Sequence, residues 1–158
     1  MSAFVLVAAF TLSSLNFVTG ASMPRWTAHG DQRCPGEDRS PELRWGRVPA
    51  GTRSLALILY DTDARWYHWV AYDLPPSLRG LSAGVALPAS EQGVNSFGEQ
   101  RYGGPCPPPG PPHHYVFTLY ALSTRAIGGV RPLDGPAALA QMRGHVIASA
   151  RLVGRYGL

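Results

Sequence analysis

Residues 103–122 read GGPCPPPGPPHHYVFTLYAL, a proline-rich loop that runs into an apolar segment. Proline fixes φ and lacks a backbone N–H, so the loop should be stiff and poor in hydrogen-bond donors. The apolar residues 115–122 predict a strand. Side chains two positions apart on a strand share a face, so His113 and Tyr115 should point together and His114 the other way. The stretch is therefore either the edge of a small polar pocket or a proline-rich crossover with incidental histidines.

Two further segments have the character of strands. Residues 54–60 read SLALILY, and such a nearly continuous apolar run suits a strand that is buried on both faces. Residues 66–74 read WYHWVAYDL and are followed by two prolines, which should end the strand. Asp61 and Asp63 lie between the two segments. We expect their carboxylates to share one face where the first strand ends.

The C-terminal part of the chain has helical spacing. Asp134 can cap a helix, Pro136 suits its first turn, and Gly144 should break or kink it. Apolar residues recur there at steps of three and four: Leu139, Met142, Val146, Ile147 and Leu152. Elsewhere 18 glycines and 15 prolines favour short strands and turns. The pattern predicts a mainly β protein with a small helix that covers one face or edge of a sheet.

Composition narrows the class of protein. A chain of 158 residues suits one domain over residues 1–158, and 45% hydrophobic with 15% charged residues is typical of a globular protein. All basic residues are arginine, which excludes lysine Schiff-base and P-loop chemistry. The arginines are scattered, so the net charge of +4 does not indicate a nucleic-acid partner.

The N-terminal residues 1–20 are apolar but make a poor secretion signal, because no basic residue precedes an apolar run that polar residues interrupt. The run is also too short and too interrupted to cross a membrane as a helix. Alternation through Phe10 and Leu12 fits an N-terminal strand, with residues 1–9 as an extension or an extra strand. This favours the cytoplasm over the periplasm or secretion.

The two cysteines, Cys34 and Cys106, are far apart and form no CxxC pair. Neither a zinc ribbon nor a thioredoxin-type site is therefore indicated. They could form a disulfide in an exported protein or remain thiols in the cytoplasm. The sequence leaves both alternatives open.

Polar side chains gather at the ends of the predicted strands, where they can meet at one rim of a sheet. They are Asp61, Asp63, His68, His113 and Tyr115. As metal ligands they would suit zinc or non-haem iron, although HxxxH and HxH spacings are missing. In a hydrolase a histidine would be the general base, with Ser96 or Cys106 as the nearby nucleophile, although no GxSxG motif is present.

A third interpretation is an anion site. Imidazoles, a phenol and the N–H groups of Gly103 and Gly104 would hold the anion, and mild acid would favour binding because histidine titrates near pH ~6.5. An open pocket with a few charge-assisted hydrogen bonds implies micromolar to millimolar affinity. His29 and His145 stand outside this set.

Six motifs in order resemble the phosphatidylethanolamine-binding protein (PEBP) family, in its bacterial and archaeal kinase-inhibitor-like branch. They are CPGEDRSPEL-W at 34–45, PAGTRSLALILYDTDA at 49–64, WYHWVAYDLP at 66–75, GVNSFGEQRYGGPCPPPG at 93–110, HHYVFTLYAL at 113–122 and GHVIASARLVGRYG at 144–157. The resemblance implies a β-sandwich of Greek-key type with short peripheral helices and a C-terminal helix. It also implies an anion pocket that accepts phosphate-like groups.

The resemblance also implies the residues of the pocket. The family's ligand-binding positions fall on Asp61, Trp66, His68, Gly104, Pro107, His113, Tyr115 and Tyr156. Two departures stand out. The family's D-P-D-A-P is here Asp-Thr-Asp-Ala-Arg at 61–65, which puts the shape of one rim in doubt, and the arginine of its H-R-Y is His114.

These observations predict a binding module for phosphate or for a phosphorylated head group or side chain. The resemblance implies a regulator of a kinase or protease, without catalytic residues, cofactor or metal. We expect a monomer or homodimer with no nucleic-acid partner and no integral membrane insertion. The alternative is a hydrolase of esterase or phosphatase type that uses Asp61, His68 and His113, with or without a metal.

Overall fold

The strands form two antiparallel sheets in the computed structural model, which describes residues 9–158. The larger sheet has the order β4 (Trp66–Leu74), β3 (Ser54–Asp61), β6 (His113–Leu122), β7 (Val146–Tyr156). The smaller sheet has the order β1 (Leu12–Ser13), β2 (Leu43–Trp45), β5 (Gly80–Leu81). The helical elements are α1 (Gly135–Met142) and the short 3-10 helices η1 (Arg25–Thr27) and η2 (Ala89–Glu91). The predicted mainly β class is confirmed.

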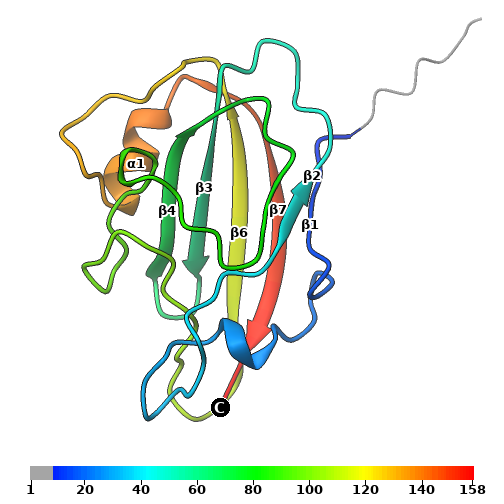
Figure 1. Ribbon diagram of the computed structural model, residues 1–158, viewed down its shortest axis with the longest axis vertical. Coiled ribbons are helices and arrows are strands. Elements are labelled where there is room, and N and C mark those ends of the chain that lie inside the picture. The colour runs from blue at the N-terminus through cyan, green and yellow to red at the C-terminus, as the bar shows by residue number, and fades with distance from the viewer. Residues whose placement is uncertain (1–8) are drawn as a thin grey trace, which may run out of the picture.

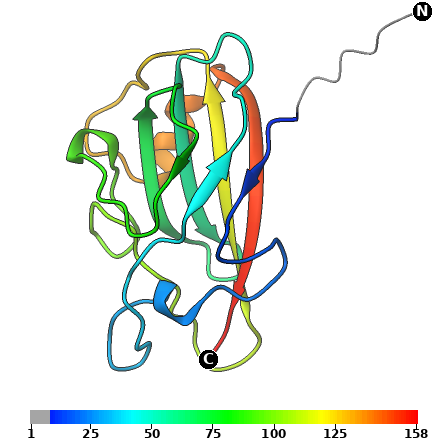
Figure 2. The same ribbon diagram turned by 45° about the vertical axis from the view of Figure 1, so that its right-hand side comes forward.

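The small sheet and α1 lie on opposite sides of the large sheet (Figures 1 and 2). This arrangement explains the composition of β3, whose side chains alternate between two apolar clusters. Leu55, Leu57 and Leu59 pack into the core between the sheets. Ala56 and Ile58 pack on the other face with Ala138 and Met142 of α1, and the free energy of burying both sets of side chains favours this layering. The strand is thus buried on both faces, as its apolar run predicts.

The helix α1 starts as predicted but ends earlier. The Asp134 side chain accepts a hydrogen bond from the Ala137 N–H at 2.9 Å and so caps the first turn. Gly144 has a φ of +80°, and the chain turns there instead of continuing as a kinked helix. The prediction that the helix extends to Leu152 was wrong, because β7 pairs along the whole of β6. Side-chain exposure alternates along the middle of β7, where Ala150 and Leu152 are buried. The three- and four-residue spacing beyond Gly144 was therefore coincidental.

At the N-terminus, the predicted strand is short. Only Leu12–Ser13 forms strand pairs, and its partner is β2. Phe17 lies beyond this strand but still packs into the core between the sheets. The predicted extension or extra strand at residues 1–9 falls outside the described residues, apart from Ala9. Among the described helices, none has the length and apolar character that crossing a membrane would require.

Chemistry-bearing segments converge at one end of the large sheet. In the sheet register, Asp61 lies opposite both Trp66 and Tyr115, and His113 lies opposite Tyr156. Figure 1 shows the loop after η1 and the proline-rich loop before β6 at this same lower end, beside the C-terminus. The fold therefore brings two loops that are distant in sequence against the ends of four strands.

Candidate functional site

A pocket of about 400 Å³ opens where these segments meet. One side, which we call the sheet wall, consists of Asp61, Ala64, Trp66, His68, His113 and Tyr115. The other side, which we call the loop wall, consists of His29, Asp31, Arg33, Phe97, Cys106, Pro107 and Pro108. Strand ends are rigid supports and the prolines restrict the loop, so the pocket is largely pre-formed.

Asp61 and His113 form the central pair of the sheet wall. The Nδ1 atom of His113 donates to Oδ2 of Asp61 at 2.7 Å. The other oxygen of Asp61, Oδ1, accepts the N–H groups of Asp63 and Ala64 at 2.9 and 3.0 Å. These bonds close the turn between β3 and β4 and stabilise this rim, which lacks the prolines of the family motif. Asp61 is 2% exposed, and its negative charge is held by donors on both oxygens.

His68 is fixed in the same way by a backbone carbonyl. Its Nδ1 atom donates to the Gly103 carbonyl oxygen at 2.8 Å, because a carbonyl can only accept. Burial lowers the pKa of His68 from its usual value of 6.5, which disfavours the charged ring, although the Gly103 carbonyl partly opposes this. The neutral ring therefore presents an unprotonated Nε2 atom.

Tyr115 lies between these rings and is fully buried. Its ring packs edge-on against His68 at a centroid distance of 5.2 Å and beside His113 at 6.5 Å. Among the described residues its hydroxyl oxygen has no hydrogen-bond partner. Burial, reinforced by the charge of Asp61, raises the pKa of Tyr115, so the phenol stays protonated and is an available donor. A buried donor without a partner costs free energy that a ligand could offset.

His29 belongs to the loop wall, so the prediction that it stands apart was wrong. Its Nδ1 atom donates to Oδ1 of Asp38 at 3.0 Å, and its ring stacks on Phe97 at 4.9 Å. Asp38 also accepts the N–H groups of Gly30 and Gly104 at 3.0 and 2.7 Å. Burial alone would raise the pKa of Asp38, but these donors outweigh it and hold that pKa below its usual range.

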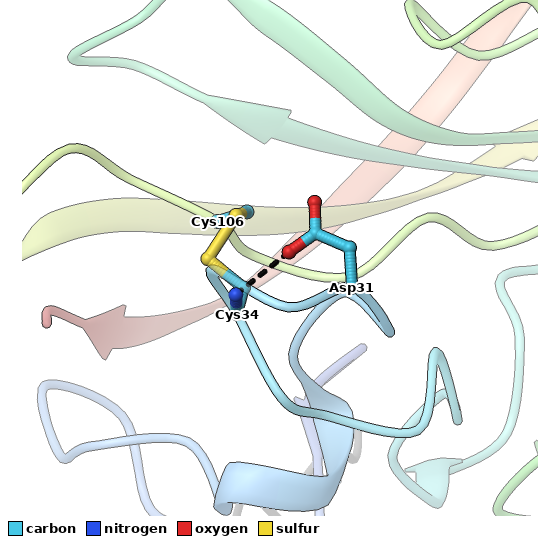
Figure 3. A group of neighbouring side chains, drawn as sticks. All are labelled: Asp31, Cys34 and Cys106. Atoms are coloured by element: carbon cyan, nitrogen blue, oxygen red, sulfur yellow. Dashed lines mark hydrogen bonds between the residues drawn. A yellow bond between two sulfur atoms is a disulfide. The ribbon is translucent and has the colours of Figure 1, made fainter.

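The loop wall is held by a disulfide between Cys34 and Cys106, whose Cα atoms lie 5.5 Å apart. This decides the pairing that the sequence leaves open. Oδ1 of Asp31 accepts the Arg33 N–H at 2.9 Å and the Cys34 N–H at 2.7 Å, the second of which Figure 3 shows. The Cys34 N–H is the main reason that the pKa of Asp31 lies below its usual range.

The structure brings together six of the eight residues predicted for the site. They are Asp61, Trp66, His68, Pro107, His113 and Tyr115. Gly104 and Tyr156 do not line the pocket. Tyr156 packs against the core between the sheets. A side chain at Gly104 would collide with the backbone of Thr27 and Ala28, so this glycine allows the loop wall to approach.

The predicted role of the glycine N–H groups was wrong. The Gly103 N–H donates to the His68 carbonyl at 2.9 Å, and the Gly104 N–H donates to Asp38. Both are therefore used within the protein and are not available to an anion.

Asp63 and His114 form a separate pair outside the pocket. Oδ2 of Asp63 accepts the N–H and Nδ1 of His114 at 2.7 and 3.0 Å. The prediction that Asp63 shares a face with Asp61 was wrong, because β3 ends at Asp61 and the chain turns. The prediction that His114 points away from the pocket is confirmed, because it is exposed and absent from both walls.

The metal and hydrolase interpretations lack support from the described residues. Asp61, His68 and His113 do not bring three ligand atoms within 4.8 Å of one another, whereas Asp31, Cys34 and Cys106 do. The two sulfurs of that group are in the disulfide and offer no thiolate (Figure 3).

The nucleophile candidates also fail. Cys106 is in the disulfide. Ser96 lies outside both walls, and its hydroxyl oxygen accepts the Tyr67 N–H at 2.8 Å.

The two packed sheets and the pocket at their end define a β-rich ligand-binding protein. The family model described as phosphatidylethanolamine-binding protein matches residues 13–157, and the chain belongs to this family. It is 42% identical over 154 residues to a UPF0098 protein of Methanothermobacter thermautotrophicus, covering 90% of this chain and 98% of the relative.

Solved structures agree with this assignment. The crystal structure of Escherichia coli YbcL, described as a member of the mammalian PEBP family, superposes with a TM-score of 0.86 at 32% identity. The superposition covers 94% of this chain and 98% of YbcL. The Chlamydia trachomatis protein CT736 gives 0.81 at 33% identity, covering 95% and 98%.

We predict that His68 makes the fold less stable in acid. Since burial lowers its pKa from 6.5, the unfolded chain takes up the proton first as pH falls. The contribution is complete above pH ~6.5 and is lost below it, with a slope of at most about 1.4 kcal/mol per pH unit for one proton. His68→Asn keeps a donor for Gly103 and should flatten this part of the curve, measured by urea unfolding between pH 5 and pH 8.

The exposed His145 provides the matched control, because His145→Asn should leave the curve unchanged. An identical pH dependence in wild type and His68→Asn would contradict the prediction.

Proposed function

We propose that this pocket binds the phosphate group of a small molecule or of a phosphorylated side chain. The observation that carries the proposal is the arrangement of His29, His68 and His113. The Nδ1 atom of each ring is bonded to an acceptor, which leaves Nε2 of His68 and His113 for a ligand, while Nε2 of His29 lies 3.8 Å from Oδ2 of Asp31. The unpartnered hydroxyl of Tyr115 adds a buried donor beside two of these rings.

Anion binding should depend on pH, because protonation changes both the charge of the histidine rings and what their Nε2 atoms can donate. A neutral ring whose Nδ1 carries the proton can only accept at Nε2, so it cannot donate to a phosphate oxygen. Protonation turns Nε2 into a charged donor, and such bonds are stronger than neutral ones. The other titratable or charged groups of the walls are Asp31, Arg33, Asp61 and Tyr115. Asp31 and Asp61 repel an anion, so each added imidazole proton should strengthen binding.

The proposal is one of binding rather than catalysis. A few charge-assisted bonds in an open pocket, after desolvation and ordering costs, imply micromolar to millimolar affinity for a bare anion. The Asp61–His113 pair alone resembles the base of a hydrolase, but neither Ser96 nor Cys106 supplies a nucleophile beside it. Membership of the family supports a regulatory role, in which the phosphate would belong to a head group or to a partner such as a kinase or protease.

We expect saturable binding of inorganic phosphate, O-phosphoethanolamine and O-phosphoserine, tighter at pH 6 than at pH 8. Calorimetry and the ring signals of His68 and His113 in NMR would measure it. Sulfate, whose charge is the same at both pH values, separates titration of the protein from titration of the ligand. Tighter binding of O-phosphoethanolamine would favour a head group, and tighter binding of O-phosphoserine would favour a protein partner.

A matched pair of histidine variants tests the site. His113→Ala should weaken phosphate binding at least tenfold, since it removes a charge-assisted bond of about 1.5–3 kcal/mol. His114→Ala removes an exposed histidine that is also paired with an aspartate, and it should bind as wild type does. Absence of binding at millimolar ligand, or equal effects of the two variants, would refute the proposal.

The Cys34–Cys106 disulfide indicates the kind of cellular compartment in which the protein functions. Disulfides persist mainly in oxidising compartments. We therefore propose that the protein functions where Cys34 and Cys106 stay paired. Alkylation of thiols in intact native cells, followed by denaturation and mass spectrometry, should leave both cysteines unmodified. Quantitative alkylation of both would instead place the protein in a reducing compartment.

A further inference from the structure

Arg33 lies in the loop wall of the pocket. Among residues 9–158, no carboxylate lies within ion-pair distance of its guanidinium group. Its side chain instead reaches the Sγ atom of Cys106 at 3.5 Å, inside the pocket lining. Most exposed arginines are simply solvated, but this one contacts the disulfide of the loop wall.

The charge balance of the pocket gives Arg33 a role. The walls contain two carboxylates, those of Asp31 and Asp61, and one arginine, Arg33. The chain has no lysine that could substitute for it. With neutral imidazoles, two carboxylates and one guanidinium give the walls a net charge of −1, and loss of Arg33 would make it −2 and increase the repulsion of an anion. Arg33 is therefore the wall residue that offsets this repulsion when the imidazoles are neutral.

The disulfide determines where Arg33 lies. Arg33 directly precedes Cys34, which is bonded to Cys106. Asp31 accepts the N–H groups of both Arg33 and Cys34 and so fixes the backbone between them. Figure 3 shows the bridge joining two separate loop segments, with Asp31 beside it. The prolines that follow Cys106 stiffen the opposite attachment point.

We propose that Arg33 binds the ligand's phosphate directly, and that the Cys34–Cys106 disulfide holds it over the pocket. The planar guanidinium can donate two parallel bonds to phosphate oxygens, which a point charge cannot. A dithiol reductant transfers two electrons and two protons, so that the S–S bond breaks, Cys34 and Cys106 become thiols, and the reductant is oxidised to its cyclic disulfide. The segment that carries Arg33 then loses its covalent attachment, and phosphate binding weakens. This inference rests on the proposed function.

The test is calorimetric titration with inorganic phosphate at pH 8, in a buffer without other multivalent anions. Arg33→Gln should weaken binding about tenfold, and Arg33→Lys should lose less because it keeps the charge. Arg125→Gln is the control for net charge, because Arg125 follows the opposite end of β6 and lies outside the pocket. It should bind as wild type does. Equal affinity of Arg33→Gln and wild type would overturn the proposal.

A thermodynamic cycle that combines reduction of the disulfide with Arg33→Gln tests whether the disulfide positions Arg33. Reduction should weaken phosphate binding several-fold in wild type but leave Arg33→Gln nearly unchanged, because both changes remove the same contact. Equal weakening in both proteins, or none in wild type, would overturn this part. Cys34→Ser/Cys106→Ser should bind like reduced wild type, and near-ultraviolet circular dichroism checks that it is folded.

The outcomes separate the two proposals. If wild type fails to bind phosphate, the proposed function and this inference both fail. If wild type binds and His113→Ala does not, while Arg33→Gln binds normally, the pocket is an anion site but Arg33 does not bind the anion.

Discussion

The pocket depends on one constraint, which is that each histidine ring in it is held through its Nδ1 atom. On the sheet wall the acceptors are the Asp61 carboxylate and the Gly103 carbonyl, and on the loop wall the acceptor is Asp38. A ring held in this way has a fixed orientation and a fixed neutral tautomer, so Nε2 of His68 and of His113 is presented to a ligand, while Nε2 of His29 faces Asp31. The His113–Asp61 bond joins two strand ends, the His68–Gly103 bond ties a strand to the proline-rich loop, and the His29–Asp38 bond holds the loop after η1. The chemistry and the local structure therefore share their contacts.

Apart from Ala64, which lies in a turn, the sheet wall could be predicted from the sequence because its residues lie on strands. The apolar run before Asp61 and the two-residue spacing of His113 and Tyr115 reflect burial and alternation, which act over a few residues. The strand β7 was missed because its apolar residues after Gly144 fit helical spacing by chance. What decides its structure is pairing with β6, a contact between distant parts of the chain.

The loop wall could not be predicted in the same way, because tertiary contacts position it. His29 lies 84 residues before His113 in the chain, and no local pattern connects them. The two cysteines were the available signal, because pairing Cys34 with Cys106 brings their two loops together. The glycine N–H groups illustrate the opposite error, since a motif suggested an anion cradle while the fold used both donors internally.

The most direct test of this account is the tautomer of each ring, determined by long-range proton–nitrogen NMR at a pH high enough to deprotonate the histidines. The account predicts a proton on Nδ1 of His29, His68 and His113, with Nε2 unprotonated, and a change at Nε2 when phosphate is added at lower pH. Protons on Nε2 of His68 and His113, or Nε2 signals that do not respond to phosphate, would contradict it.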